Sequence, residues 1–234
     1  LNGVVDPRMG VTERGRRCKT CGKDYITCEG HMGHISLAVP VFNFQFDKTI
    51  IAISKCICTK CSRLMINKDH PVVKNILLST ENNNYERFNK MFKLIMSNKK
   101  PKKIFRCGIT EEDKKAGNAT LLDNGGCGAI QPDVFRNDIR DNLITMEWRN
   151  LDSSSEASSG GMPQNIIQQQ SAQFFYNLFK AISAEDAAAL GFSPEYCMPH
   201  YLIFKSLPVI PPCSRPSVRQ GNGNRSEDDI TIKY

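Results

Sequence analysis

The residues best suited to chemistry lie in the stretch RCKTCGKDYITCEGHMGH, which runs from Arg17 to His34 and holds three cysteines and two histidines. Thiolates and imidazoles are common ligands of Zn²⁺, and two ligands three residues apart can bind one ion from a single tight turn. Gly22 permits the positive φ that such a turn often needs. The spacing Cys-x2-Cys-x6-Cys-x2-His therefore predicts a zinc site with four protein ligands: Cys18, Cys21, Cys28 and His31.

Four protein ligands leave no open position for water or substrate, so we expect this site to be structural rather than hydrolytic. A zinc hydrolase would also need a general base, and no His-Glu-x-x-His motif occurs in the sequence. His34 lies close enough to compete with His31 for the fourth position. We favour His31 because Cys28-x2-His31 repeats the spacing of the first pair; His34 is then a surface or core-edge imidazole.

A second group of cysteines begins in KCICTKCSRL, where another pair is spaced three residues apart. Its remaining ligands have to come from far along the chain, and two cysteines beside glycines, in FRCGI and GGCGAIQP, are the candidates. The sequence predicts a second structural zinc site formed by four thiols: Cys58, Cys61, Cys107 and Cys127.

The spacing of the ten cysteines indicates metal binding in a reducing compartment rather than disulfides. We expect Cys56 to be a small buried hydrophobic residue, and Cys197 and Cys213 to be free thiols. The net charge of +7 over 234 residues would stay positive with zinc bound, which is compatible with a polyanionic partner without proving one. No stretch approaches the roughly 20 apolar residues of a membrane span, so no membrane partner is expected.

Around the cysteines, the hydrophobic patterns predict an irregular, loop-rich α+β fold. β-branched and aromatic residues indicate strands at 35–46, 49–58, 142–148 and 201–207. Apolar residues three and four apart indicate helices at 71–78, 85–96 and 166–182. A short helix is expected between Ser183, a good N-cap, and Gly191. Such segments bury little apolar surface, and structural zinc would supply on the order of 10 kcal/mol of folding free energy.

The composition divides the chain into three parts. LDSSSEASSGGMPQN, residues 151–165, is a polar low-complexity insert that we expect to be flexible. It separates a zinc-binding part at 1–150 from a part at 166–234 with helices, a strand and a loop. For the basic loop SNKKPKK, residues 97–103, we favour solvated surface over contact with nucleic acid.

Near its end the chain has a proline-rich stem, LPVIPPCSRPSV, and a tip, RQGNGN. This segment contains three arginines: Arg215, Arg219 and Arg225. Positive charges on a rigid stem suit phosphate contact, although an ordinary solvated loop fits the sequence equally well. In SEDDITIKY, Ser226 and Asp229 have the spacing of a capping box, which accounts for the acidic residues better than a Mg²⁺ site does. Because the chain starts at Leu1 and stops soon after this helix start, we expect a fragment.

These motifs resemble the N-terminal clamp region of the largest subunit of multisubunit DNA-directed RNA polymerases. GVVDPRMG is similar to the family's entry motif, the segment from Cys18 to His34 to its zinc motif, and ISLAVPVFN to its next strand. GGCGAIQP resembles part of the second clamp zinc site, and LPVIPPCSRPSV with EDDITIK resembles the lid segment. Asn43 replaces the family's usual histidine, and Cys213-Ser214 interrupt the proline run. GVTERGRRC looks most like RNA polymerase II; a virus-encoded homologue is the alternative.

The resemblance implies a clamp that closes over template DNA and the RNA–DNA hybrid, with a lid at about 212–228 that helps separate RNA from template. Arg215, Arg219 and Arg225 would lie near phosphates. The partners would include other polymerase subunits, notably the second-largest, and the location would be the nucleus, or a cytoplasmic viral factory for a viral homologue.

The whole enzyme would be a nucleotidyltransferase. The family's Mg²⁺ loop, NADFDGD, does not occur in this sequence, so the resemblance assigns no catalytic residue here and leaves Mg²⁺ to the full enzyme. The alternative function is that of a stand-alone zinc-dependent adaptor that binds nucleic acid or protein.

Overall fold

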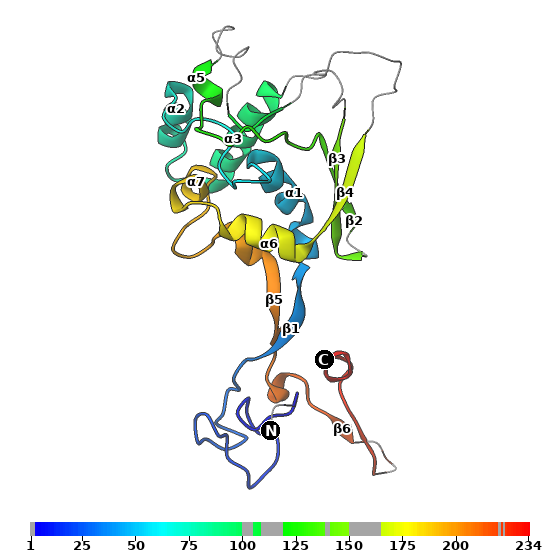
Figure 1. Cartoon of the computed structure of the whole chain (residues 1–234). Coiled ribbons are helices and arrows are strands. Elements are labelled where there is room, and N and C mark those ends of the chain that lie inside the picture. The colour runs from blue at the N-terminus through cyan, green and yellow to red at the C-terminus, as the bar shows by residue number, and fades with distance from the viewer. Residues whose placement is uncertain are drawn as a thin grey trace. The chain divides into compact units, whose positions relative to one another are not determined.

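The computed structural model describes residues 3–99, 105–108, 119–138, 141–149, 165–219, 221 and 223–234. The chain forms two compact units, one made of Leu1–Ala38 with Lys205–Tyr234 and the other of Val39–Phe204. It passes between them in β1 (Gly33–Phe42) and β5 (Ile203–Val209), which pair with each other in a two-stranded sheet (Figure 1). The fold is mixed α+β and irregular, as the sequence predicted.

Most of the described helices lie in the larger unit. Polar side chains cap several of them: His70, Asn83 and Ser183 accept hydrogen bonds from backbone N–H groups in the first turn of the helices that they precede. The helices are α1 (Asp47–Cys56), α2 (Pro71–Ser79), α3 (Asn84–Asn98), α5 (Ala119–Leu122), α6 (Ala172–Lys180) and α7 (Ala184–Ala189), with short 3-10 turns at Phe44–Phe46 and Pro199–Leu202.

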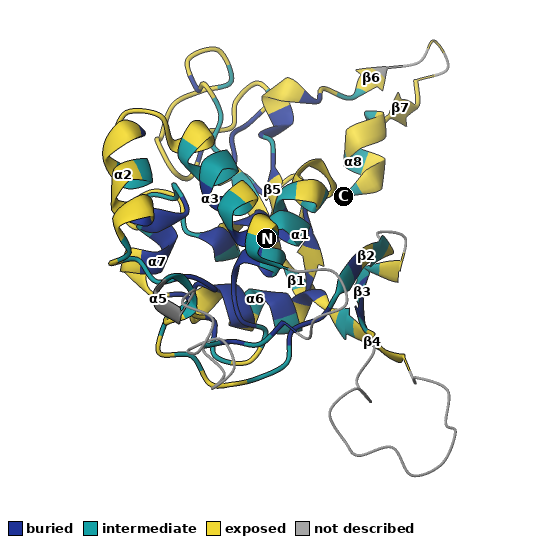
Figure 2. Ribbon diagram, turned by 90° about the horizontal axis from the view of Figure 1, so that it is seen from above, coloured by how far each residue is buried: buried dark blue, intermediate teal, exposed yellow. Residues whose placement is uncertain are grey.

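An antiparallel sheet completes this unit, with strand order β2 (Val134–Asp138), β3 (Leu143–Trp148), β4 (Ile166–Ser171). Phe135 lies opposite Met146, and both are buried. The edge strand β4 is largely exposed (Figure 2). The core lies where α1, α3 and α6 bring their apolar side chains together, and includes Ile50, Ile53, Met91, Ile95, Phe175 and Phe179.

The smaller unit has little regular structure beyond its parts of β1 and β5. It contains a 3-10 turn at Pro212–Ser214, the short hairpin of β6 (Val218–Arg219) and β7 (Arg225–Ser226), and α8 (Asp229–Lys233). One of its few buried clusters consists of Val11, Cys18 and Cys28, with Tyr25 packed against them. Two predicted metal ligands are thus themselves core residues.

Several predicted elements are confirmed. The helices expected at 71–78 and 85–96 are α2 and α3, the short helix capped by Ser183 is α7, and strands lie at or close to 35–46, 142–148 and 201–207. The insert at 151–165 lies outside the described residues except for Asn165, as does the basic loop beyond Lys99.

The strand predicted at 49–58 is wrong, because this segment is the greater part of α1. Its β-branched residues favour a strand, but Ile50, Ile53 and Ser54 are buried at helical spacing, and this burial decides the structure. The helix predicted at 166–182 is half wrong: its first residues form β4, and only Ala172–Lys180 is helical. Strand β2 was not predicted.

The predicted capping role of Ser226 is also wrong. Ser226 belongs to β7, and α8 begins after Asp228, whose carboxylate accepts a hydrogen bond from the backbone N–H of Ile230 at 2.9 Å. In the described part of the chain, no helix has both the length and the apolar character needed to cross a membrane.

Phe175 offers a direct test of the core. It is fully buried and makes edge-to-face contacts with Phe42, Phe174 and Phe179. We expect Phe175→Ala to lower the free energy of unfolding by about 3–5 kcal/mol, because it removes buried surface and leaves a cavity. Phe44→Ala, at a side chain 68 % exposed, is the control and should cost less than about 1 kcal/mol. Chemical denaturation of both variants measures the difference, and equal losses would contradict this view of the core.

Candidate metal centres

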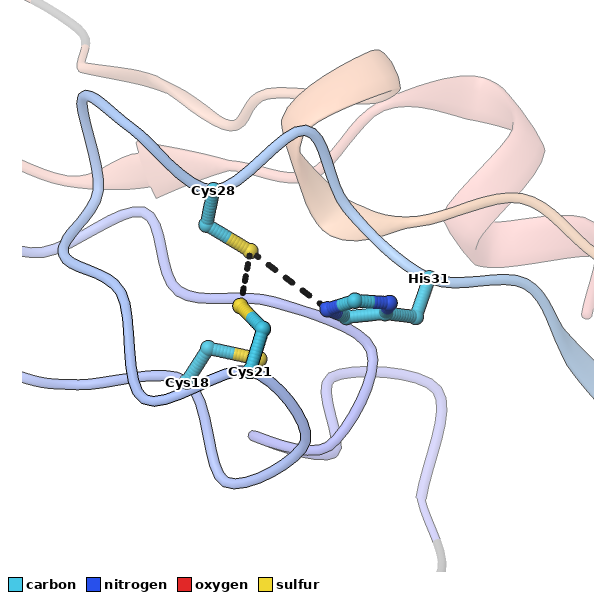
Figure 3. A group of neighbouring side chains, drawn as sticks. All are labelled: Cys18, Cys21, Cys28 and His31. Atoms are coloured by element: carbon cyan, nitrogen blue, oxygen red, sulfur yellow. Dashed lines mark hydrogen bonds between the residues drawn. The ribbon is translucent and has the colours of Figure 1, made fainter.

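The first group of ligands is built on a tight turn that contains Cys18 and Cys21. The backbone N–H of Gly22 donates to the carbonyl of Cys18 at 2.8 Å, and the N–H of Cys18 donates to the carbonyl of Lys23 at 2.9 Å. Gly22 has a φ of +71°, which glycine adopts without steric cost. The turn brings both sulfur atoms to the same side of the loop (Figure 3).

The other two ligands come from the loop that follows. The N–H of Cys28 donates to the carbonyl of Asp24, whose carboxylate accepts bonds from the backbone N–H and the hydroxyl of Thr27. The N–H of His31 donates to the carbonyl of Met9 at 2.9 Å. Figure 3 shows the four side chains turned toward one another, and their ligand atoms all lie within 4.8 Å of each other.

The second group repeats the same turn with different residues. The N–H of Ser62 donates to the carbonyl of Cys58 at 3.0 Å, and the N–H of Cys58 donates to the carbonyl of Arg63 at 2.9 Å. Ser62, which takes the place of Gly22, has a φ of +59°, an unusual conformation for a serine. Cys61 lies within this turn.

A short antiparallel ladder brings in the two distant cysteines. The N–H of Cys107 donates to the carbonyl of Ala129, and the N–H of Gln131 donates to the carbonyl of Phe105. Gly126 is needed here, because a Cβ at this position would lie 2.5 Å from the sulfur of Cys107. Cys127 lies two residues before Ala129, at the end of this ladder. The four sulfur atoms of Cys58, Cys61, Cys107 and Cys127 lie within 4.8 Å of one another.

The separations within both groups fit a tetrahedral zinc ion. With Zn–S bonds of about 2.3 Å, two sulfurs of a tetrahedron lie roughly 3.8 Å apart, whereas the sulfurs of a disulfide are about 2.05 Å apart. The sulfur–sulfur distances are 3.6 Å for Cys21 and Cys28, 3.7 Å for Cys58 and Cys127, and 3.6 Å for Cys61 and Cys107. The Nε2 atom of His31 lies 3.8 Å from the sulfur of Cys28. All ten cysteines are free, and each group could hold one zinc ion.

Hydrogen bonds prepare one sulfur in each group for metal binding. Burial alone would raise the pKa of the Cys18 thiol, but the backbone N–H groups of Cys21 and Thr20, together with neighbouring thiols, lower this pKa to about 6. The thiol of Cys107 lowers the pKa of Cys58 to about 4, with further help from backbone N–H groups, and the same bond raises the pKa of Cys107. Both groups therefore present a thiolate at neutral pH.

The remaining cysteines and His34 lie outside the two groups. Cys56 is fully buried, and burial raises the pKa of its thiol to about 12, as expected for a small core residue. Cys197 and Cys213 are exposed. Of the two histidines considered for the first group, the structure brings His31 to the sulfurs and not His34.

The three arginines of the proline-rich segment do not form one exposed cluster. Arg215 is only 3 % exposed, and its guanidinium donates to the carbonyls of Ile210 and Val4 and to the hydroxyl of Thr231. This placement does not fit the phosphate contact predicted for Arg215. Arg225 is partly exposed and forms an ion pair with Glu13 at 3.2 Å. For Arg219, only the backbone in β6 is described.

Sequence reasoning missed two features of the surroundings. The side chain of Gln131 donates to the sulfur of Cys58 at 3.2 Å, and its position in GGCGAIQP, four residues after Cys127, was the available signal. Basic residues also flank the first two ligands of the first group in the sequence, and all three are exposed: Arg17, Lys19 and Lys23. Their clustering next to the cysteines is visible in the sequence.

These features define a loop-rich α+β protein with two groups of four side chains, each suited to a closed structural metal site. Compared with protein families, the chain matches the model of RNA polymerase Rpb1, domain 1, over residues 1–234. The chain therefore belongs to this family and represents the N-terminal region of the largest subunit of RNA polymerase. The resemblance to the largest subunit of RNA polymerase is thereby confirmed.

The turn at Gly22 yields one prediction. A Cβ at Gly22 would meet nothing within 4 Å, so Gly22→Ala should act only through the positive φ, at a cost of about 1 kcal/mol. We expect zinc affinity of the first group to fall about fivefold, measured by competition with a chelator. Gly3→Ala is the control, since Gly3 has open space and no positive φ. An unchanged affinity for Gly22→Ala would show that the turn does not limit binding.

Acid should protonate the two lowered thiols of the metal-free chain in a fixed order. The pKa is about 6 for Cys18 and about 4 for Cys58, so each thiolate persists below the ordinary thiol value and is lost as pH falls through the folded value. We expect Cys18 to lose its thiolate at higher pH than Cys58, as measured by the pH dependence of alkylation at each cysteine. Protonation in the reverse order would contradict these pKa shifts.

Proposed function

We propose that this chain is the zinc-stabilised clamp module of a DNA-directed RNA polymerase, which closes over template DNA and the RNA–DNA hybrid during transcription. The match of all 234 residues to the Rpb1 domain 1 family carries the proposal. Residues 1–150 would form the clamp head and core with both metal sites, and residues 166–234 would add helices and the lid. The likeness to RNA polymerase II supports a nuclear location and contact with the second-largest subunit.

Both ligand groups would hold structural zinc, with Cys18, Cys21, Cys28 and His31 at the first ion and Cys58, Cys61, Cys107 and Cys127 at the second. Four protein ligands close the coordination sphere, which supports a role in stiffening loops rather than in hydrolysis. A clamp has to move as one body, and metal-bound turns would give these loop-rich segments the rigidity that this requires.

The lid would be formed by the segment at about 212–228. Its described part consists of the turn at Pro212–Ser214 and the hairpin of β6 and β7. Arg215 anchors the base of this hairpin internally, because its guanidinium bonds to three segments of the same unit. The hairpin would then help to separate RNA from template at the upstream end of the hybrid.

Contact with nucleic acid would fall to exposed basic residues. Arg225 is 46 % exposed, and Arg219 precedes the tip of the hairpin. Arg17, Lys19 and Lys23, exposed beside Cys18 and Cys21 in the sequence, would add positive charge near the first ligand group. Phosphate contacts of this kind strengthen binding without sequence preference and weaken as salt rises.

Nucleotide addition would take place in another part of the polymerase. The acidic run of Glu227, Asp228 and Asp229 is accounted for by α8, since Asp228 caps the helix and Asp229 lies in its first turn. Mg²⁺ would accordingly be bound by the full enzyme outside this chain.

A polymerase assembled with Arg219→Ala and Arg225→Ala tests the lid assignment. We expect the RNA–DNA hybrid to extend further upstream, because the lid would hold the nucleic acid less firmly, and nuclease protection of stalled complexes measures its length. Lys180→Ala, at an exposed lysine that ends α6, is the matched control. A hybrid of unchanged length in the double variant would count against the lid.

A further inference from the structure

Gln131 makes four contacts around the second ligand group although it is not one of the ligands. It is 5 % exposed. Its Nε2 donates to the sulfur of Cys58 at 3.2 Å and to the carbonyl of Ala129 at 2.9 Å. Its Oε1 accepts from the backbone N–H of Thr59 at 2.8 Å and from the hydroxyl of Thr59 at 3.2 Å.

These partners determine which way the carboxamide is turned. The backbone N–H of Thr59 can only donate and the carbonyl of Ala129 can only accept, so the oxygen of Gln131 has to face Thr59 and the NH₂ group has to face Ala129. The same orientation directs the second N–H at the sulfur of Cys58. That sulfur is thus an acceptor, which is the role of a thiolate.

A group of four thiolates has a particular need for such a donor. Four thiolates around one Zn²⁺ carry a net charge of −2, and N–H groups directed at the sulfurs disperse it. Cys58 also receives the backbone N–H groups of Lys60 at 3.4 Å and Cys61 at 3.5 Å, so the bond from Gln131 is the shortest of the three.

Gln131 also joins the two halves of the group. The turn of Cys58 and Cys61 and the ladder of Cys107 are far apart in the sequence, and Gln131 lies 73 residues from Cys58. Its backbone N–H pairs with Phe105 in the ladder while its side chain bonds to the turn at Cys58 and Thr59. Removing this side chain would loosen the turn relative to the ladder.

We propose that Gln131 is a positioning residue of the second metal site, which holds the Cys58 sulfur as an N–H-bonded thiolate ligand of zinc. This inference rests on the proposal that the second group binds zinc. It does not depend on the polymerase function.

The test uses the 234-residue chain loaded with Co²⁺, whose thiolate charge-transfer absorption reports on the electron density of the sulfurs. The variants are Gln131→Met, which removes donors and acceptor at similar volume, and Gln131→Glu, which keeps the acceptor for Thr59 and removes the donors. Gln169→Met, at an exposed glutamine of β4, is the matched control.

We expect one of the two bound metals to be held about 10- to 100-fold more weakly in both variants, measured by chelator competition. The other metal, in the first group, should be unaffected and serves as the internal reference. The charge-transfer band of the weakened site should move to longer wavelength in Gln131→Met, because the sulfur loses a hydrogen-bond donor. Gln169→Met should match the wild type in every measurement.

Lower thermal stability of Gln131→Met with an unshifted band would make Gln131 a packing residue and overturn the proposal. Equal metal retention by Gln131→Glu would do the same, and this variant decides the matter if Gln131→Met does not fold. A wild-type chain that binds one metal only, at the first group, would instead refute zinc binding by the second group.

Discussion

The structure meets one requirement at two places: four ligand atoms have to converge for one metal ion to be held. A Cys-x-x-Cys turn satisfies half of this requirement locally, because its backbone hydrogen bonds bring two sulfurs together. The other half has to be supplied by a second segment, which in the second group lies 46 and 69 residues away along the chain. The entropy lost in closing a loop grows only with the logarithm of its length, so one bound ion can hold together segments far apart in sequence.

In the smaller unit the ligands Cys18 and Cys28 belong to the buried cluster itself, so folding and metal binding there would be one event. In the larger unit Cys58 and Cys107 are likewise fully buried members of the core, which there also contains the apolar side chains of several helices.

The ligand groups could be predicted from the sequence because their rules are local and their residues are rare. Cysteines three residues apart are a common arrangement of metal ligands, and outside the first group only two further cysteines stand beside glycines to complete the second group. Ser62 shows what such rules do not capture: it adopts the left-handed conformation that Gly22 adopts in the first turn, yet its residue type does not indicate it. The role of Gln131 was not predicted either: its place four residues after Cys127 is visible in the sequence, but the bond from its carboxamide to a thiolate is recognised only from its partners in space.

The fold was predictable where local preference and burial agree. Helices α2 and α3 combine a capping side chain with apolar residues on one face, and both were expected. The prediction failed for α1, where three isoleucines favour a strand but the buried positions follow the period of a helix. It failed again at β4, where three of the six residues are glutamines without strand preference and the strand forms by pairing with β3. In both cases the deciding contacts come from elements distant in sequence, which a local pattern cannot contain.

Arg215 illustrates why the density of positive charge is a weak guide to a nucleic-acid surface. A guanidinium has five N–H donors in a rigid plane, so it can join backbone carbonyls as readily as it binds phosphate. Here it joins Ile210, Val4 and Thr231, and it lies over the ring of Tyr234 at 5.5 Å. These bonds tie the proline-rich stem to the chain's first residues and to α8. The hairpin of β6 and β7 lies between these anchors in sequence, so its base is held from both sides. If the hairpin is the lid, Arg215 acts on nucleic acid indirectly, by orienting the hairpin that carries Arg219 and Arg225.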